Sequence, residues 1–447
     1  MAKQLFGTDG IRGAAGEPPL DDHTVFAVGL ALGDMLRTES ESSVLIGMDT
    51  RESGPHIAAM LAGGLAGKGV VVRFAGVIPT PAVAYLTQSQ SYAAGIMISA
   101  SHNPFHDNGI KVFGPSGMKL PDSREEELEA EILRLRDRTV PGLAESLQPD
   151  ESLDETYVEH LLSAVAEERE IAGQRVIVDC ANGAAARLAP KVFQGLGVNA
   201  EIFGDRPDGR NINEGCGSLH LESLQERVAA SDGRFGVAFD GDADRALFVD
   251  EDGAIVDGDV ILLLAAEYLA RCDKLPRSRI VTTVMANMGL EKALGKRGLS
   301  MVRTPVGDKY VLEEMVRENA SLGGEQSGHV IFRDHATTGD GLLTALMMMR
   351  ILAAEQKPLR DLRTRLSVFP QALENIPVTA KPPIDEMPVL ADAVERSRRE
   401  LDGRGRVLVR YSGTEPLARV MVEAETQTLV DEHTHRLVQL FRQELGA

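Results

Sequence analysis

Residues 44–98 decide the fold: VLIGMDTRESGPHIAAMLAGGLAGKGVVVRFAGVIPTPAVAYLTQSQSYAAGIMI. Short apolar runs, VLIGM (44–48), VVVRFAG (70–76) and AAGIMI (93–98), alternate here with longer segments of helical periodicity. This alternation is typical of βαβ units, whose strands form a parallel or mixed sheet that helices cover. The stretch therefore predicts an α/β fold with ligands at the carboxyl ends of the strands.

The same alternation returns twice further along the chain. A second cycle extends from residue 175 to the hairpin-like ALFVDEDGAIV (246–256), and a third extends over residues 259–333. Beyond residue 370 the composition shifts to RVLVRYSGTEPLARVMVEAET (406–426), with strand-like alternation, and a final helix. We expect three similar mixed α/β domains and a smaller C-terminal α+β domain, with the ranges 1–150, 151–252, 253–369 and 370–447.

Composition argues against several classes of protein. The 447 residues carry a net charge of −20, which repels nucleic acid and anionic membranes, and there is no tryptophan to build a stacking platform. No apolar run approaches the roughly 20 residues of a membrane span, and the start of the chain has no apolar signal core. Cys180, Cys216 and Cys272 lie far apart in the sequence, which fits a reducing compartment. We expect a cytoplasmic protein with no nucleic-acid or membrane partner.

Three carboxylates follow an apolar run in FDGDADRALFVDE: Asp240, Asp242 and Asp244. They repel one another unless a cation lies among them, and hard oxygen ligands favour magnesium, with calcium or manganese as alternatives. The spacing also fits an EF-hand loop with Glu251 at its twelfth position, but Arg245 stands where that loop needs glycine. A solvated acidic turn is the third alternative. The pattern predicts a metal site.

A candidate nucleophile lies in GIMISASHNPFHDNGIK (95–111). Ser101 follows the apolar run, next to His102 and before a proline-fixed turn, so we expect an exposed nucleophilic serine. The alternative is a Ser/Asn turn that satisfies its own backbone, and the segment lacks the GxSxG elbow of acyl hydrolases. Residues 107–109 are interpreted as turn formers, and Lys111 as a cation that neutralises phosphate.

Two later segments offer hydrogen-bonding groups beside glycine. In SLGGEQSGHVIF, alternate positions carry side chains that suit sugar hydroxyls: Glu325, Ser327 and His329. In RYSGTEPLAR, guanidinium groups, hydroxyls and backbone N–H groups give the composition of a phosphate cradle: Arg410, Ser412, Gly413, Thr414 and Arg419. A glycine-rich turn and an ordinary hairpin turn are the alternatives. At the amino end, FGTDGIRG places Arg12 in a glycine-bracketed loop, where it could meet a phosphoryl group.

Taken in order, five segments resemble the signature series of the α-D-phosphohexomutase superfamily: FGTDGIRG, ISASHNPFHDNGIK, DGDADR, GGEQSGH and RYSGTEP. They are spread over essentially the whole chain. The first, the fourth and NINEGCGSLH (211–220) look most like bacterial phosphoglucosamine mutases, which interconvert glucosamine 6-phosphate and glucosamine 1-phosphate for UDP-N-acetylglucosamine and cell-wall precursor synthesis. The alternative is a phosphomannomutase/phosphoglucomutase of the same superfamily. His106 departs from the pattern, where tyrosine is usual, outside the reacting groups.

The resemblance implies a fold, a metal and a mechanism. It implies four domains around a central cleft, the last resembling the TATA-binding-protein fold. Ser101 is implied to carry a phosphoryl group and to share one Mg²⁺ per active site with the three aspartates. The sugar would pass through a 1,6-bisphosphate, with glucosamine or glucose 1,6-bisphosphate as primer. Arg12, Lys111 and Arg245 would offset charge on the transferring group, and Lys111, His102 or His329 would handle the hydroxyl proton.

The resemblance also implies how the sugar phosphate is held. Glu325 and Ser327 would bind ring hydroxyls in both orientations, the cradle around Arg410 would bind the phosphate that is not reacting, and the last domain would rotate to close. A homodimer is the assembly it favours. Two other classes remain as alternatives: a metal-dependent phosphatase that uses Ser101, and a non-catalytic sensor of calcium or sugar phosphate.

Overall fold

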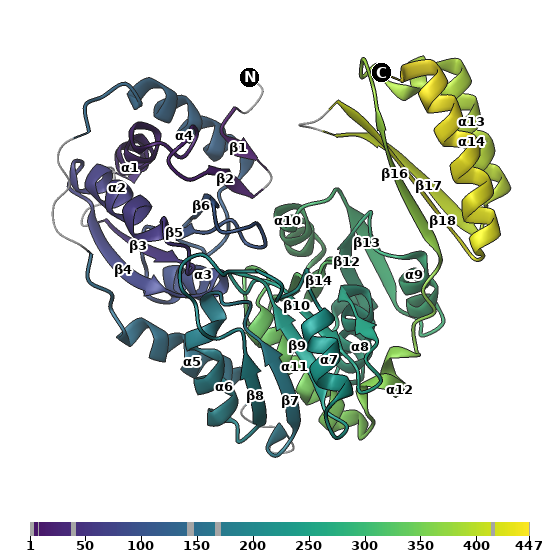
Figure 1. Ribbon diagram of the computed structural model, residues 1–447, viewed down its shortest axis with the longest axis horizontal. Coiled ribbons are helices and arrows are strands. Elements are labelled where there is room, and N and C mark those ends of the chain that lie inside the picture. The colour runs from purple at the N-terminus through teal and green to yellow at the C-terminus, as the bar shows by residue number, and fades with distance from the viewer. Residues whose placement is uncertain are drawn as a thin grey trace. The chain divides into compact units, whose positions relative to one another are not determined.

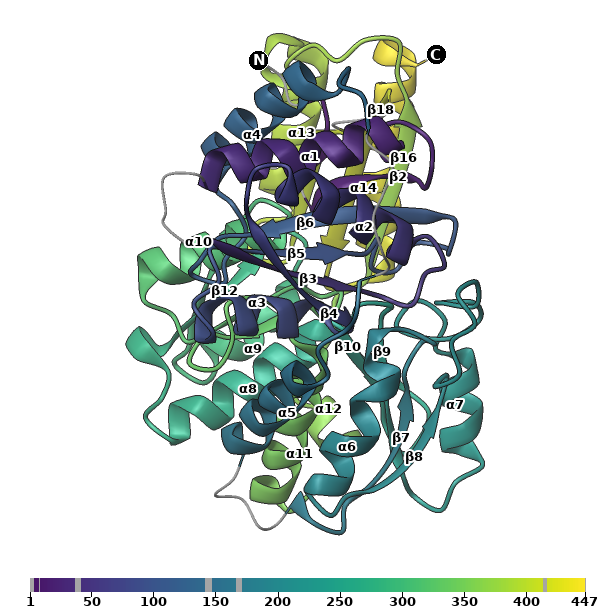
Figure 2. The ribbon, with the colours of Figure 1, turned by 90° about the vertical axis from the view of Figure 1, so that its left-hand side faces the viewer.

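The computed structural model describes residues 4–7, 9–36, 42–140, 147–165, 171–412 and 416–446 (Figures 1 and 2). The predicted residues Gly413 and Thr414 lie outside these ranges. The chain divides into two compact units, Met1–Met285 with Leu299–Thr364 and Ala286–Gly298 with Arg365–Ala447. The four predicted domain ranges stay a prediction.

The first sheet of the larger unit has the strand order β1-β2-β6-β5-β3-β4. Its strands are β1 (Phe6–Gly7), β2 (Gly10–Ala14), β3 (Ser43–Met48), β4 (Val71–Val77), β5 (Ala94–Ile98) and β6 (Asp107–Phe113). Its helices are α1 (Asp22–Leu36), α2 (Gly54–Ala66), α3 (Thr80–Ser89) and α4 (Asp122–Leu135). β3 is parallel to β4 and β5, whereas β6 is antiparallel to β2 and β5, so the sheet is mixed.

Strand alternation distributes the residues of β5 between two helical layers. Ile96 and Ile98 belong to a core cluster with apolar residues of α1, α2 and α4, and Figure 2 shows α1 and α4 close together. Gly95 faces α3, where a Cβ atom would lie 2.1 Å from Thr87 Oγ1. Helices therefore cover both faces, and the strand ends are left for polar loops.

The second and third sheets of the larger unit repeat this plan. The second has the order β11-β10-β9-β7-β8 and the third β13-β12-β14-β15. The elements of the second are α5 (Ser152–Ala164), β7 (Arg175–Asp179), the 3₁₀ helix Ala184–Arg187, α6 (Ala189–Gly195), β8 (Asn199–Phe203), α7 (Glu222–Ala229), β9 (Phe235–Phe239), β10 (Ala246–Val249) and β11 (Ile255–Val256). Those of the third are α8 (Gly258–Arg271), the 3₁₀ helix Pro276–Ser278, β12 (Arg279–Thr283), β13 (Ser300–Thr304), α10 (Asp308–Glu318), β14 (Leu322–Gly324), β15 (Val330–Phe332), α11 (Gly341–Glu355) and α12 (Leu359–Arg363).

The smaller unit contains an antiparallel sheet with the order β16-β18-β17. Its elements are α9 (Met288–Gly295), β16 (Gln371–Pro377), the 3₁₀ helix Ile384–Glu386, α13 (Pro388–Glu400), β17 (Gly405–Tyr411), β18 (Leu417–Ala424) and α14 (Gln427–Leu445). Figure 1 shows α13 and α14 on one face of this sheet. Val430, Leu437 and Phe441 recur at helical spacing on α14 and are fully buried, so the helix packs through an apolar stripe.

Two local predictions are wrong. Arg12 lies in strand β2 rather than in a loop, and residues 107–109 begin strand β6 rather than form a turn. Glycine and asparagine favour turns locally, but β2 and β6 pair with each other, and Arg12 stands opposite Gly109. Tertiary pairing overrides the local preference here. Among the described helices, none is long and apolar enough to cross a membrane.

Candidate active site

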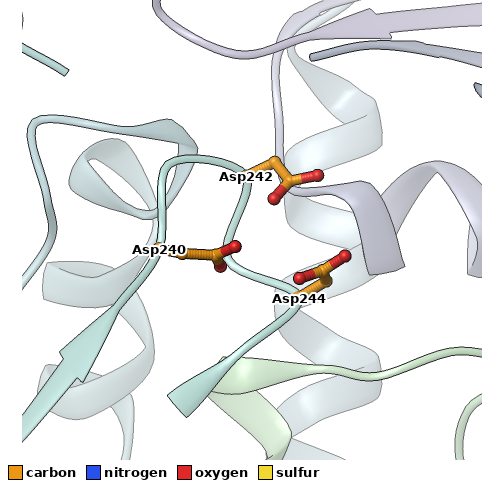
Figure 3. Close-up of side chains that lie close together, drawn as sticks. All are labelled: Asp240, Asp242 and Asp244. Carbon is orange, nitrogen blue, oxygen red and sulfur yellow. The ribbon is translucent and has the colours of Figure 1, made fainter. Parts of the chain in front are cut away.

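The acidic loop, residues 240–245, connects β9 to β10. Because every residue of β9 is buried, the loop begins inside the protein, and the carboxylates of Asp240, Asp242 and Asp244 are buried with it. One ligand oxygen from each lies within 4.8 Å of the others, and Figure 3 shows the three side chains gathered in one place. Burial, Asp244 and Asp242 raise the pKa of Asp240 well above its usual range.

Two oxygens of this cluster point to a cation. Asp242 Oδ1 and Asp244 Oδ1 are buried and have no hydrogen-bond partner among the described residues. Unpaired carboxylate oxygens are costly away from water, and a hard divalent ion prefers oxygen ligands of this kind. The residues present therefore fit a bound Mg²⁺.

Ser101 directly adjoins this cluster. It lies just beyond β5, is 1% exposed and has a φ of 53°, a left-handed conformation that is unfavourable for a residue with a side chain. Its Oγ donates to Asp240 Oδ2 at 2.6 Å, and its backbone N–H donates to Ser99 Oγ at 2.8 Å. The sequence predicted an exposed serine, whereas the structure buries it beside the carboxylates.

Arg51 holds the serine loop in place, and the sequence analysis missed it. Its Nη2 donates to the carbonyl oxygens of Ser101 at 3.0 Å and Asn103 at 2.8 Å, and its Nη1 donates to those of Pro104 and Asp107. Asp49 pairs with the guanidinium through Nε at 2.8 Å. The signal in the sequence was DTR (49–51), charged residues directly after a buried strand.

Lys111 brings positive charge to the acidic loop from β6. Its Nζ lies 2.8 Å from Asp242 Oδ2, 3.1 Å from Asp9 Oδ2 and 3.4 Å from Asp244 Oδ2, and the side chain is 1% exposed. Burial opposes the charged form, but Asp242 and Asp9 outweigh it and raise the pKa of Lys111 well above its usual range. Lys111, which the sequence predicts to neutralise phosphate, therefore lies beside the acidic loop.

The other predicted residues around Ser101 are also close to it. Arg245 Nε lies 3.8 Å from Asp244 Oδ1 and 4.0 Å from Asp240 Oδ2. His102 Nδ1 lies 3.1 Å from Ser101 Oγ, and burial, Arg245 and Arg12 lower the pKa of His102 to about 4.

Arg12 contributes from a neighbouring strand. It pairs with Asp9, which the sequence analysis did not single out. Asp9 occupies the turn between β1 and β2 and also contacts Lys111, so it links two predicted cations.

The segment with Glu325, Ser327 and His329 connects β14 to β15 as a hairpin. Ser327 Oγ donates to Glu325 Oε2 at 3.5 Å, and the backbone N–H of Gly307 donates to Glu325 Oε1 at 3.1 Å. His329 is 2% exposed and accepts from the Gly339 N–H at 3.1 Å. The structure thus pairs Glu325 with Ser327, while the histidine ring is buried.

The predicted phosphate cradle belongs to the smaller unit. Arg410 on β17 stands directly opposite Arg419 on β18, and burial and Arg419 lower the pKa of Arg410. Ser412 follows β17, and its carbonyl oxygen accepts from Lys381 Nζ at 2.6 Å. Like charges directly opposite each other on neighbouring strands repel, so this pair suits an anion.

Comparisons with known proteins identify the class. The phosphoglucomutase/phosphomannomutase models of alpha/beta/alpha domains I, II and III match residues 3–139, 155–253 and 257–369, and the C-terminal domain model matches residues 373–440. The chain belongs to this phosphohexomutase family, an isomerase class of enzymes that move a phosphoryl group. The predicted superfamily and the predicted fold class are confirmed.

Individual relatives within this family have known names or solved structures. The chain is 53% identical to a phosphoglucosamine mutase of Solibacter usitatus over 100% of both chains, and 51% identical to that of Koribacter versatilis over 99% of this chain and 98% of the relative. Among solved structures, a phosphoglucomutase/phosphomannomutase family protein of Burkholderia thailandensis is 26% identical with a TM-score of 0.81, covering 98% of this chain and 99% of its own.

A further solved structure is similar to this chain in its fold only. This is an Aspergillus fumigatus N-acetylphosphoglucosamine mutase in complex with GlcNAc-6P and magnesium. It is 20% identical with a TM-score of 0.67, covering 98% of this chain and 96% of its own.

Proposed function

We propose that this protein interconverts glucosamine 6-phosphate and glucosamine 1-phosphate, with Ser101 as the phosphoryl carrier. The observation that carries the proposal is the position of Ser101 Oγ, 2.6 Å from a carboxylate of the buried acidic loop. The names of the full-length relatives support the amino sugar as substrate. A phosphomannomutase/phosphoglucomutase activity is the second candidate, because the family models carry that description.

Mg²⁺ would be held by Asp240, Asp242, Asp244 and a phosphate oxygen on Ser101. The three carboxylates, with two buried oxygens that accept no hydrogen bond from the described residues, fit such an ion. When bound, Mg²⁺ offsets negative charge on the phosphoryl group. The positive side chains around it, Lys111 and Arg245, add to that effect in a buried setting, where charge interactions are strong.

The first step transfers the phosphoryl group from Ser101 to the free hydroxyl of the sugar phosphate. The phosphorus–oxygen bond to Ser101 breaks, a bond to the sugar oxygen forms, and the hydroxyl proton leaves. Lys111 is our candidate for handling that proton, with His102 and His329 as alternatives. His102 Nδ1 also lies 3.1 Å from the serine oxygen that is left behind. The product is the 1,6-bisphosphate.

The second step returns the other phosphate to Ser101 after the bisphosphate has turned around. Glu325 and Ser327 would hold ring hydroxyls in both orientations, because their carboxylate and hydroxyl lie side by side. The residues assigned to the phosphate that is not reacting are Arg410, Ser412, Gly413, Thr414 and Arg419. A glucosamine or glucose 1,6-bisphosphate would prime enzyme whose Ser101 has lost its phosphate.

A parallel isomerisation assay tests the proposal. Purified protein with Mg²⁺ and a 1,6-bisphosphate primer is given glucosamine 6-phosphate, mannose 6-phosphate and glucose 6-phosphate. We expect the amino sugar to be converted fastest. Faster conversion of the mannose or glucose phosphate would keep the mechanism and replace the substrate, whereas release of inorganic phosphate without isomerisation would indicate a phosphatase.

A further inference from the structure

Lys119, which none of the sequence motifs included, connects two distant segments of the larger unit. It lies in the stretch after β6, and its side chain is 9% exposed. Its Nζ pairs with Asp9 Oδ1 in the β1–β2 turn and lies 2.6 Å from Asp308 Oδ2 at the first residue of α10. This one ammonium group therefore joins its own segment to Asp9, 110 positions away in the chain, and to Asp308, 189 positions away.

Both carboxylates also contact residues of the candidate active site. Asp9 Oδ2 lies 3.1 Å from Lys111 Nζ and also pairs with Arg12, while Asp308 Oδ2 lies 3.6 Å from His329 Nε2. Charges of alternating sign thus form a charge chain from Lys111 through Asp9 and Lys119 to Asp308. At one end this charge chain contacts the acidic loop, and at the other it contacts the histidine of the sugar-binding hairpin.

The charge chain restricts how its four side chains can move. Asp9 is shared among Lys111, Lys119 and Arg12, and Asp308 accepts from Lys119. A shift of one side chain therefore separates a partly buried ion pair and leaves a charge without its partner, which is costly. Asp308 and Asp9 outweigh the effect of burial and raise the pKa of Lys119, so its ammonium group is charged. Lys119 therefore fixes both of its carboxylate partners.

We propose that Lys119 is a positioning residue for phosphoryl transfer. By holding Asp9, it keeps Lys111 and Arg12 directed at the group that is transferred. By holding Asp308, it keeps the same distance between the phosphoserine site and the sugar-binding hairpin in both half-reactions. The inference rests on the mutase function proposed above.

Lys309 provides a matched control for a purely structural role. It is 7% exposed, and its Nζ lies 2.8 Å from Asp122 Oδ1 and 3.1 Å from Glu125 Oε2. Like Lys119, it is a lysine with little exposed surface that pairs with two carboxylates, here both on α4. None of its ion pairs involves a residue of the candidate active site.

The test compares K119M, K119R and K309M by kcat, KM and free energy of unfolding. We expect K119M to lower kcat about 10- to 100-fold with KM changed less than about threefold, since small misplacements of catalytic groups act on the transition state. K309M should lose comparable stability and keep kcat within about twofold. K119R, which retains the charge, should recover most of the lost kcat.

Two results would overturn the inference separately from the function. If the wild type isomerises sugar phosphate and K119M keeps its kcat, Lys119 does not position the site. If K119M and K309M lower kcat equally, the loss is structural. A wild-type protein that isomerises none of the three sugar phosphates would reject the proposed function, and this role of Lys119 with it.

Discussion

The two units of this protein each hold a cluster of like charges, with opposite signs. In the larger unit three carboxylates gather in the acidic loop, and in the smaller unit Arg410 faces Arg419 across two strands. Like charges repel one another, so a ligand of the opposite sign stabilises each cluster, in addition to the Lys111 and Arg245 side chains that already adjoin the carboxylates. The comparison indicates that one principle suits the acidic loop to a cation and the arginine pair to an anion, and the predictions below test both.

The largest effect on turnover should come from Ser101, which adjoins the acidic cluster. S101A should lower turnover at least about a thousandfold, because it removes the phosphoryl carrier without creating a core cavity. Intact mass should show about 80 Da of phosphate on the wild type and none on S101A. An active S101A protein would remove Ser101 from its role.

The next prediction concerns the acidic cluster itself. Millimolar Mg²⁺ should raise the melting temperature of the wild type by about 3 °C or more, since a ligand that binds the folded state stabilises it. D240N should lose most of this rise. Without Mg²⁺, D240N should be at least as stable as the wild type, because one of three repelling buried charges is gone.

D252N is the control for that measurement. The Asp252 side chain is 62% exposed and lies outside the acidic loop, so the variant should show the full response to Mg²⁺. Equal Mg²⁺ responses of the wild type and D240N would place the ion elsewhere.

The cationic pair should respond through substrate binding. R410M should raise KM for the sugar phosphate about tenfold, the size of one lost charge-assisted hydrogen bond. The free energy of unfolding should not fall, because the substitution also removes the repulsion between Arg410 and Arg419. R406M is the control on the same strand. Arg406 pairs with the buried Glu423, so R406M should lose stability and keep KM. A KM that R410M leaves unchanged would reject the predicted cradle.

The sequence predicted much of the site because its motifs follow or lie in apolar runs whose periodicity was readable. Ser101 follows β5 and Lys111 lies in β6 of the first sheet, Asp240 follows β9 of the second, and only the family resemblance implied that these segments share one site. The roles of Asp9, Arg51 and Lys119 could not be derived this way. Asp9 and Arg51 each have one local partner, but the contacts with Lys111, with the Ser101 carbonyl and with Asp308 join distant segments, and sequence spacing carries no information on which group a distant side chain meets.

Local preference also misled where pairing decided the structure. Residues 107–109 favour a turn by composition, yet they pair with β2 as the start of β6. The burial of Ser101 was missed for a related reason. The residues that bury it, among them Asp240 and Asn213, come from a later part of the chain.

Asp340 is a single buried carboxylate outside the acidic loop, so it shows what burial does to one carboxylate that has no neighbouring carboxylates and no proposed ligand. Burial raises the pKa of Asp340 to about 6, although Tyr157 Oη at 2.8 Å and the Leu343 N–H at 2.9 Å donate to it. Since this pKa lies above the unfolded value of about 3.9, the folded state holds a proton that the unfolded chain releases. The resulting stability is complete below about pH 4 and is lost as the pH rises through 6.

D340N isolates this contribution, because asparagine caps a helix as well as aspartate does and does not titrate. Between pH 4 and pH 7, the free energy of unfolding of the wild type should fall by about 3 kcal/mol relative to D340N, at about 1.4 kcal/mol for each pKa unit. Denaturant unfolding of both proteins at several pH values measures the difference. Parallel curves would mean that the pKa of Asp340 is the same in the folded and unfolded protein, so that hydrogen bonds alone offset the burial of this charge, whereas the carboxylates of the acidic loop also have Lys111 and Arg245 beside them.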